Sequence, residues 1–128
     1  MELIFYKCNV CGQIVATVKG TGMPITCCKE EMSMLVSGSV DASLEKHVPV
    51  ISRRCCKVVV SVGEEEHPMT EDHYIEWIAI QTKTGNQRKL LAPGDKPEAC
   101  FRICKDDTVI AAYAYCNLHS LWRVKVML

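Results

Sequence analysis

The sequence lacks an excess of charge of either sign. Its 15 lysine and arginine residues are balanced by 15 aspartate and glutamate residues, so the formal net charge is zero. A protein that binds nucleic acid needs a basic surface that displaces the counterions around the phosphates. The balanced charge therefore predicts no nucleic-acid partner.

The sequence also lacks a long apolar run. The longest apolar-leaning stretch, Val109 to Tyr115, is far shorter than the ~20 residues that a membrane-spanning helix requires. The segment Met1 to Lys7 has no basic region followed by a long apolar one, so it does not read as a signal peptide. We therefore expect a cytoplasmic protein without membrane contact. In such a reducing compartment, closely spaced cysteines are more often metal ligands than disulfides.

A long amphipathic helix, an internal repeat and a low-complexity segment are absent as well. From residue 45 onwards, short runs rich in β-branched and aromatic residues alternate with turn residues. One helical turn is expected at residues 71–73. Short strands with closely spaced turns are typical of a β-sandwich. Seven strands are predicted, at residues 47–51, 56–62, 74–81, 87–91, 98–103, 109–115 and 121–126.

The chain is short for two ordinary domains, so a small metal-stapled module followed by one domain is the expected organisation. Residues 1–36 form the predicted module, in which strands at 5–7 and 14–18 flank a Cys-x-x-Cys turn. The small and polar segment 37–44 is predicted to be a linker. Residues 45–128 form the predicted sandwich domain, and the expected fold class is all-β.

Nine cysteines stand out in so short a chain, and four of them form the first candidate metal site. These four are Cys8, Cys11, Cys27 and Cys28. Four thiolates can close a tetrahedron around zinc or iron, although the vicinal second pair predicts a distorted one. The spacing leaves a structural zinc and a one-iron redox centre equally open. A redox disulfide between Cys8 and Cys11 is a weaker alternative, because no βαβ pattern surrounds it.

The second candidate site uses every histidine of the chain and one further cysteine. Its members are His47, His67, His73, Cys116 and His119. Because the loops of a β-sandwich cluster at its two ends, these side chains are expected to meet at one metal. Four imidazoles and a thiolate suit iron, whereas zinc prefers four ligands. The alternative is that each histidine is an ordinary surface or core residue. That explanation would have to apply to all four histidines independently.

The charges of the two sites predict different tasks. Ferrous iron with four neutral imidazoles and one thiolate has a charge of +1, and five ligands leave one position open. Such a site attracts a small anion by roughly 1–4 kcal/mol at ~4 Å. A divalent metal with four thiolates has a charge of −2 and no open position. The first site is therefore expected to deliver electrons, and the second to react.

Two charged residues directly precede the first histidine. Lys46 is expected to draw an anion to the open position and to hold a proton-donating water there. Glu45 is expected to cap the same position when the iron is ferric. The alternative is that both are solvated loop charges.

The remaining cysteines, Cys55, Cys56, Cys100 and Cys104, are expected to be free thiols that act as small fillers. A disulfide between Cys100 and Cys104 is excluded if both lie on one strand, because their Cα atoms would be about 13 Å apart. A vicinal disulfide between Cys55 and Cys56 would be strained. A cross-strand pairing between the two groups has no support in the sequence, and the arginines at 53–54 are expected at a solvated edge.

Taken together, these residues closely resemble the desulfoferrodoxin family, the two-iron superoxide reductases, over nearly the whole chain. The motifs that carry the resemblance are YKCNVCG at 6–12 with Cys27-Cys28, EKHVPV at 45–50, HPMTEDHYIEWI at 67–78, LAPGDKPEA at 91–99 and YCNLHSLW at 115–122.

The resemblance implies a rubredoxin- or desulforedoxin-like module followed by an immunoglobulin-like β-sandwich, and a homodimer. It implies iron rather than zinc at the four-cysteine site. At the second iron it implies four equatorial histidines and an axial Cys116. The implied reaction is the one-electron reduction of superoxide to hydrogen peroxide without release of oxygen, with electrons from a rubredoxin-like donor.

Three other functions remain open from the sequence. The main alternative is a non-catalytic iron electron carrier, against which the open position argues. A zinc-stabilised interaction module would contain zinc and be colourless. A superoxide dismutase would release oxygen.

Overall fold

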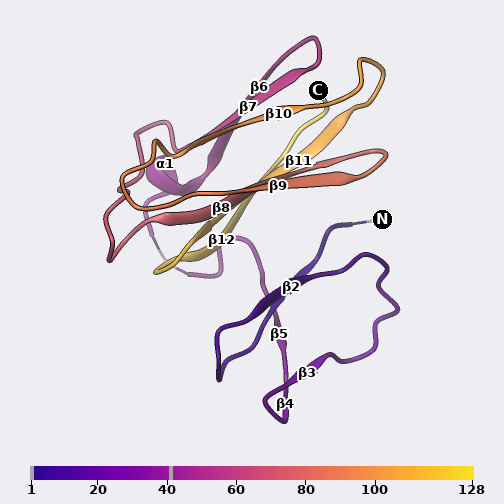
Figure 1. Cartoon of the computed structure of the whole chain (residues 1–128), viewed down its shortest axis with the longest axis vertical. Helices are drawn as coiled ribbons and strands as arrows, with labels where there is room; N and C mark the ends of the chain where they lie inside the picture. Colours follow the sequence, from indigo (N-terminus) through magenta and orange to yellow (C-terminus); the bar gives the residue numbers. More distant parts are fainter. Residues whose placement is uncertain (1, 41) are drawn as a thin grey trace. The chain divides into compact units, whose positions relative to one another are not determined.

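The structure is a computed structural model that describes residues 2–40 and 42–128. Met1, at the start of the expected module, and Asp41, within the expected linker, lie outside the described residues. The chain divides into two compact units, with the boundary between Val36 and Ser37 (Figure 1). In the described part of the chain, no helix has the length and apolar character needed to cross a membrane.

The first unit consists of two small antiparallel sheets. One sheet has the order β2-β1-β5, from β2 (Ile14–Ala16), β1 (Phe5–Lys7) and β5 (Ser33–Met34). The other pairs β3 (Thr26–Cys27) with β4 (Glu30–Glu31). The two predicted strands are present, although β2 ends earlier than expected, before the fully exposed Val18. The strands β3, β4 and β5 were not predicted, because two residues are too few to show an alternating pattern.

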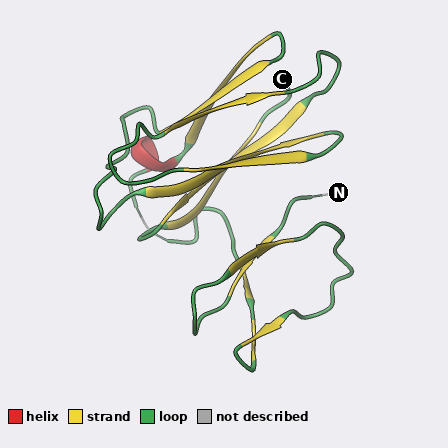
Figure 2. Cartoon of the chain, viewed as in Figure 1, coloured by secondary structure: helices red, strands yellow, loops and turns green. Residues whose placement is uncertain are grey.

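The second unit is a β-sandwich, and the predicted all-β fold class is confirmed (Figure 2). Its first sheet has the order β10-β7-β6 and its second the order β12-β11-β8-β9. All seven predicted strands are present: β6 (Pro49–Arg54), β7 (Lys57–Val62), β8 (Ile75–Thr82), β9 (Asn86–Leu90), β10 (Glu98–Arg102), β11 (Val109–Cys116) and β12 (Ser120–Lys125). Compared with the constant-type immunoglobulin fold, β9, the fourth strand, pairs with β8 in the second sheet instead of joining the edge of the first sheet.

Two local predictions at the ends of these strands were wrong. His47 does not begin a strand, because Leu44–His47 forms the short helix α1 and β6 starts only at Pro49. Residues 71–73 are not helical. Instead, Thr70 and His73 exchange backbone hydrogen bonds of 3.0 and 3.2 Å, which closes a tight turn and leaves no helical pattern.

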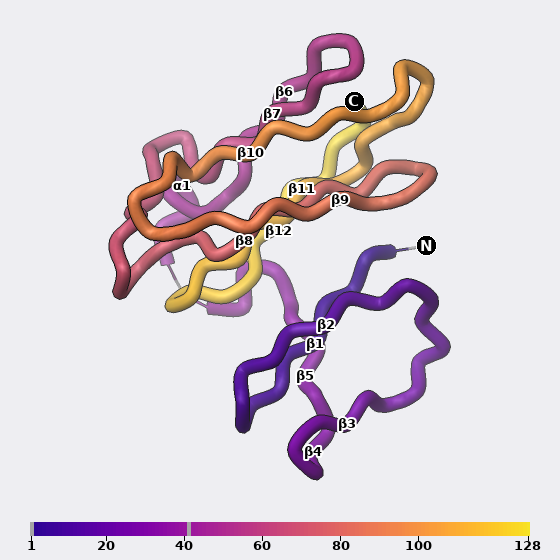
Figure 3. Tube along the Cα trace, in the orientation of Figure 1, coloured from indigo at the N-terminus to yellow at the C-terminus, as the bar shows by residue number. Residues whose placement is uncertain are grey.

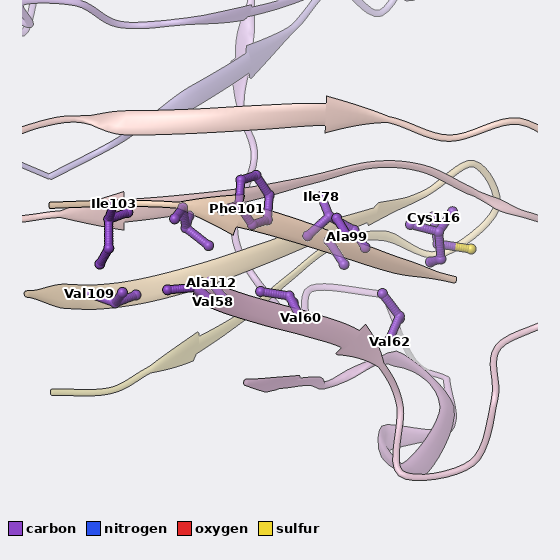
Figure 4. Close-up of a cluster of buried hydrophobic side chains, with 13 residues drawn as sticks. Val58, Val60, Val62, Ile78, Ala99, Phe101, Ile103, Val109, Ala112 and Cys116 are labelled. Carbon is purple, nitrogen blue, oxygen red and sulfur yellow. The ribbon is translucent and has the colours of Figure 1, made fainter. Parts of the chain in front are cut away.

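The core lies between the two sheets and consists of aliphatic residues around Phe101. Alternate residues of β7, among them Val58, Val60 and Val62, are fully buried in it. Figure 4 shows this row of side chains, with Ile103 and Val109 at one end and Cys116 at the other. One end of the hydrophobic core therefore meets the second group of candidate metal ligands.

Two candidate metal centres

The first unit brings its four candidate thiols together. The sulfur atoms of Cys8, Cys11, Cys27 and Cys28 all lie within 4.8 Å of one another. The Sγ of Cys27 is 3.7 Å from that of Cys11 and 3.9 Å from that of Cys28. A tetrahedron with metal–sulfur bonds of ~2.3 Å has edges of about 3.8 Å. The thiols are therefore spaced as a tetrahedral metal requires.

The vicinal pair reaches this spacing through the backbone. Cys28 and Lys29 have φ values of 52° and 62°, in the left-handed region that is unfavourable for residues with a Cβ. Together they reverse the chain between β3 and β4. The vicinal spacing therefore strains the turn, whereas both Sγ···Sγ distances from Cys27 stay close to the tetrahedral value.

Hydrogen bonds within the thiol cluster favour one thiolate over the others. The backbone N–H groups of Cys11 and Val10 lower the pKa of Cys8 to about 6. The pKa of Cys27 is raised to about 12, chiefly by its hydrogen bonds with Cys8 and then with Cys11. Without a metal, Cys8 therefore ionises readily, whereas Cys27 keeps its proton until a bound cation displaces it.

The second unit gathers the other five candidate ligands at one end of the sandwich. His47 is the last residue of α1, and His67 lies in the loop between β7 and β8. His73 closes the tight turn directly before β8. Cys116 ends β11, and His119 lies in the turn between β11 and β12. The five residues come from four separate segments of the chain.

The four imidazole rings form a closed square. Between neighbours, the ring centroids are 4.6 Å apart for His47 and His67, 4.7 Å for His67 and His73, 5.1 Å for His73 and His119, and 4.9 Å for His119 and His47. Across the diagonal, the centroids of His47 and His73 are 6.3 Å apart. Each neighbouring pair is nearly perpendicular, with interplanar angles from 79° to 83°.

The arrangement of His47 and His67 requires a cation between the two rings. The Nδ1–H of His47 donates to the carbonyl of Ser43 at 2.6 Å, and that of His67 to the carbonyl of Pro68 at 2.7 Å. Burial lowers the pKa of both rings, that of His67 to about 4, so both are neutral near pH 7. Their Nε2 atoms are then both acceptors, yet they lie only 3.1 Å apart. A metal ion between them turns this repulsion into coordination.

The other ligand atoms fit the same metal. The Nδ1 of His119 is 3.0 Å from the Nε2 of His47. Two nitrogens at right angles around a metal, with bonds of ~2.1 Å, are separated by about 3.0 Å. The Nε2 of His73 is buried and lacks a hydrogen-bond partner among the described residues. His119 therefore offers Nδ1 and the other three histidines offer Nε2, a difference that spacing in the sequence does not reveal.

Cys116 supplies the sulfur from the core side of the square. Its side chain is fully buried, and its Sγ is 3.8 Å from the Nδ1 of His119. Burial raises its pKa, while the backbone N–H groups of His119 and Leu118 act in the opposite direction. Cys116 pairs with Ser120 across a three-residue turn, and the φ of Ser120 is 62°. This tight turn is the reason that a Cys-x-x-His sequence presents both ligands to one point.

Asn117 connects this turn to the segment that contains His73. Its side-chain Oδ1 accepts the N–H of Tyr74 at 3.0 Å, and its Nδ2–H donates to the carbonyl of Asp72 at 3.0 Å. Its backbone N–H donates to the carbonyl of Tyr74 at 3.2 Å. Sequence reasoning did not identify this residue, although its place between two ligands was a signal.

Two further residues, Trp122 and Gly63, support the segments that contain the ligands, and the sequence did not identify them. The Nε1–H of Trp122 donates to the carbonyl of His119 at 3.0 Å, and its ring packs 4.9 Å from that of His47. Gly63 follows β7 with a φ of +85°. A Cβ at Gly63 would lie 2.6 Å from the carbonyl oxygen of Glu45 and 2.7 Å from the Cα of Lys46, and it would also collide with the Glu65 carbonyl.

Glu45 and Lys46 are exposed on α1, directly before His47. Burial is the main cause that lowers the pKa of His47 and His73, but the charge of Lys46 also contributes at both rings. Lys46 therefore acts electrostatically on the histidine square. The four cysteines outside the two centres are free thiols, as expected, and none of them is buried.

Comparisons with known proteins agree with this arrangement. Residues 39–125 match the sequence profile described as Desulfoferrodoxin, and residues 2–35 match the Desulfoferrodoxin N-terminal domain. The chain belongs to the desulfoferrodoxin family. It is 46% identical over 118 residues to a desulfoferrodoxin homolog of Archaeoglobus fulgidus, covering 92% of this chain and 93% of that protein. It is 44% identical over 120 residues to the desulfoferrodoxin of Nitratidesulfovibrio vulgaris, covering 94% of each chain.

A solved structure extends the likeness to the fold. The superoxide reductase from Treponema pallidum matches with a TM-score of 0.83 and 37% identity, over 98% of this chain and 100% of that one. The four-thiol group and the group of four histidines and one thiol fit the two iron centres of a desulfoferrodoxin. The membership predicted from the motifs is confirmed.

Proposed function

We propose that this protein is a superoxide reductase. The reaction joins one superoxide anion, one electron and two protons to give hydrogen peroxide, without release of oxygen. The observation that carries the proposal is the square of four imidazoles with a buried thiol beside it. Four neutral donors and one thiolate fit an iron ion that can alternate between the ferrous and ferric states and so supply the electron.

The burial of the ligands supports an approach of the substrate from the solvent side. Cys116, His47 and His67 are buried, whereas Lys46 is exposed on α1. An anion would therefore approach the site from solvent rather than through the core beside Cys116, and the exposed Lys46 would add positive charge to that approach. Lys46 draws superoxide in and orders the water that donates protons, and Glu45 closes this side after the product has left.

The proposal also assigns the domains of the chain, its electron donor and its oligomeric state. We assign residues 1–36 to a desulforedoxin-like module with iron at its four cysteines, 37–44 to a linker, and 45–128 to the reductase domain. The negative charge of the four-thiolate site suits electron transfer and disfavours an anionic substrate. A rubredoxin-like protein is the proposed electron donor, and the active form is a cytoplasmic homodimer. Sedimentation of the iron-loaded protein tests the dimer, and reduction by a purified rubredoxin tests the donor.

The products of the reaction test the function itself. The iron-loaded, reduced protein is mixed anaerobically with superoxide, and peroxide and oxygen are both measured. A reductase forms one peroxide for each superoxide consumed and no oxygen. A dismutase forms half as much peroxide and releases oxygen, and that result would refute the proposal.

A pure electron carrier is the remaining alternative, and ligand binding separates it from the reductase. A reductase needs an accessible position at the second iron, so azide or cyanide should change the visible spectrum of that centre. A visible spectrum that neither anion changes would favour the electron carrier. Zinc at both sites, found by elemental analysis of anaerobically purified protein, would favour an interaction module.

A further inference from the structure

A pair of adjacent thiols forms the turn between β6 and β7. Arg54 at the end of β6 pairs with Lys57 at the start of β7, so the turn consists of Cys55 and Cys56 alone. Cys55 is exposed and Cys56 is half-buried. Their Sγ atoms lie 3.4 Å apart. Neither the proposed reaction nor the two metal centres use these thiols.

The backbone of this turn is unfavourable for cysteine. Cys55 has a φ of 54°, in the left-handed region. Two-residue hairpin turns normally place Gly, Asn or Asp there, because a larger side chain is strained. The chain thus keeps a thiol where glycine would fit better, and such a local outlier points to a role for the side chain.

Arg53 fixes this turn and adds positive charge to it. The arginine was expected at a solvated edge, but its guanidinium donates to the carbonyl of Cys55 at 2.7 Å. The same group also binds the loop after β10 and residue 128. Its other acceptors are the carbonyls of Cys104 at 3.2 Å, Lys105 at 2.9 Å, Asp107 at 2.6 Å and Leu128 at 3.0 Å. The positive charge of Arg53 also acts on the pair, where it opposes the effects that raise the pKa of Cys56 without outweighing them.

The two thiols differ in a way that assigns them different roles. The pKa of Cys56 is raised, chiefly by its hydrogen bond with the sulfur of Cys55. Cys56 therefore holds its proton more firmly than an ordinary cysteine does, and Cys55 is the more exposed of the two. Cys55 is the better placed to attack a small oxidant, and Cys56 to resolve the product.

We propose that Cys55 and Cys56 form a redox site at which hydrogen peroxide oxidises the two thiols to a vicinal disulfide. The Cys55 thiolate attacks one peroxide oxygen, an S–O bond forms as the O–O bond breaks, and the first water leaves with the proton of Cys56. The sulfur of Cys56 then attacks that of Cys55, and the hydroxide that departs takes back from solvent the proton that Cys55 released, which gives the second water. Two thiols lose two electrons in total, and one peroxide becomes two waters. The proposal depends on the proposed function only for the source of the peroxide.

The geometry favours a reversible disulfide rather than a structural one. Adjacent Cα atoms are ~3.8 Å apart across a trans peptide, whereas disulfides usually join Cα atoms 4.4–6.8 Å apart. A bond formed here is strained, and strained, exposed disulfides are easily reduced by cellular thiols. The Cys55-Cys56 turn precedes β7, and Gly63 follows β7 and contacts α1, so this turn and the helix that ends in His47 lie at opposite ends of the strand (Figure 3).

Trypsin makes a direct test possible. Cleavage after Arg54, Lys57, Arg102 and Lys105 puts the pair, Cys100 and Cys104 on three separate peptides. The iron-loaded protein is treated anaerobically with added hydrogen peroxide, its remaining thiols are alkylated in acid, and the peptides are weighed. The expected product is peptide 55–57 lighter by two hydrogens and unalkylated, formed several-fold faster than any change at Cys100. Mild thiol reductants should reverse it.

Matched variants complete the test. Cys55→Gly, which suits the positive φ, and Cys56→Ser should each abolish the product, while Cys100→Ser should leave it unchanged. Because the peroxide is added, the test does not require superoxide reduction to occur. The proposal is overturned if the pair stays alkylatable at peroxide levels that oxidise Cys100. A disulfide that links peptide 55–57 to Cys104 would also overturn it.

Discussion

The Nε2 atoms of His47 and His67 lie 3.1 Å apart, although each ring donates its other nitrogen's proton to a backbone carbonyl. Both rings are neutral because burial lowers their pKa values, so two lone pairs point at one another. This pair of acceptors is built for a cation, and its dependence on metal can be measured.

Metal removal should therefore destabilise the second unit. Anaerobic chelation is expected to lower the thermal midpoint, because binding energy is lost and the opposed lone pairs remain. Calorimetry of the loaded and stripped protein measures the change, and ferrous iron should restore it. An unchanged midpoint after complete removal from the second site would show that the histidine square is stable alone.

Replacement of Gly63 should disturb α1 and, with it, the histidine ligand at its end. Gly63→Ala introduces a Cβ against the backbone at Glu45 and Lys46, in a conformation that alanine disfavours. We expect a loss of about 3 kcal/mol in unfolding free energy and weaker iron binding at the second site. Gly85→Ala is the matched control, because its Cβ meets nothing within 4 Å. Equal stability of both variants would contradict the argument.

Asn117 should behave as a positioning residue for the ligand turn. Asn117→Ala removes the side-chain hydrogen bonds with the Tyr74 N–H and the Asp72 carbonyl. It should lower the unfolding free energy by about 2 kcal/mol. Asn117→Asp keeps the acceptor for Tyr74 but loses the donor to Asp72, so an intermediate loss is expected. Chemical denaturation and the visible spectrum of the second iron measure both effects. Aspartate no better than alanine would show that the Tyr74 hydrogen bond is unimportant.

The sequence predicted the strands and the ligand sets well because both depend on local signals. β-branched and aromatic residues between turn signals indicated most strands of the sandwich, and each ligand is a distinctive residue type. The ligand atoms could not be predicted, because the choice of Nε2 at His47 depends on a hydrogen bond from its Nδ1–H to the Ser43 carbonyl, which the residue types alone do not reveal. The role of Gly63 depends on a contact between segments far apart in the chain. The hydrogen bonds of Arg53 were not predicted for the same reason, since its carbonyl acceptors lie mostly in other loops.

Loss of one thiolate in the first unit should empty only the first metal site. Cys11→Ser weakens one corner of the thiol tetrahedron, whereas the second site takes all its ligands from the other unit. Elemental analysis should find one bound iron instead of two, and the spectrum of the histidine-ligated centre should persist. Cys100→Ser, at an exposed thiol outside both sites, should keep both irons. Loss of both irons in Cys11→Ser would show that the units do not bind metal independently.

Lys46 should govern how fast superoxide is captured rather than whether it is reduced. Its charge acts on the histidine square, so Lys46→Ala should slow the bimolecular step by roughly tenfold at low ionic strength. Salt screens such attraction, and the dependence of the rate on ionic strength should therefore flatten in the variant. Lys83→Ala is the matched control, because Lys83 and His73 lie beyond opposite ends of β8, which is itself about 24 Å long at ~3.4 Å per residue. Pulse radiolysis of the reduced protein at several salt concentrations measures the rates. If Lys46→Ala and Lys83→Ala show the same rate and the same salt slope, the attraction comes from the metal charge alone and Lys46 has no part in it.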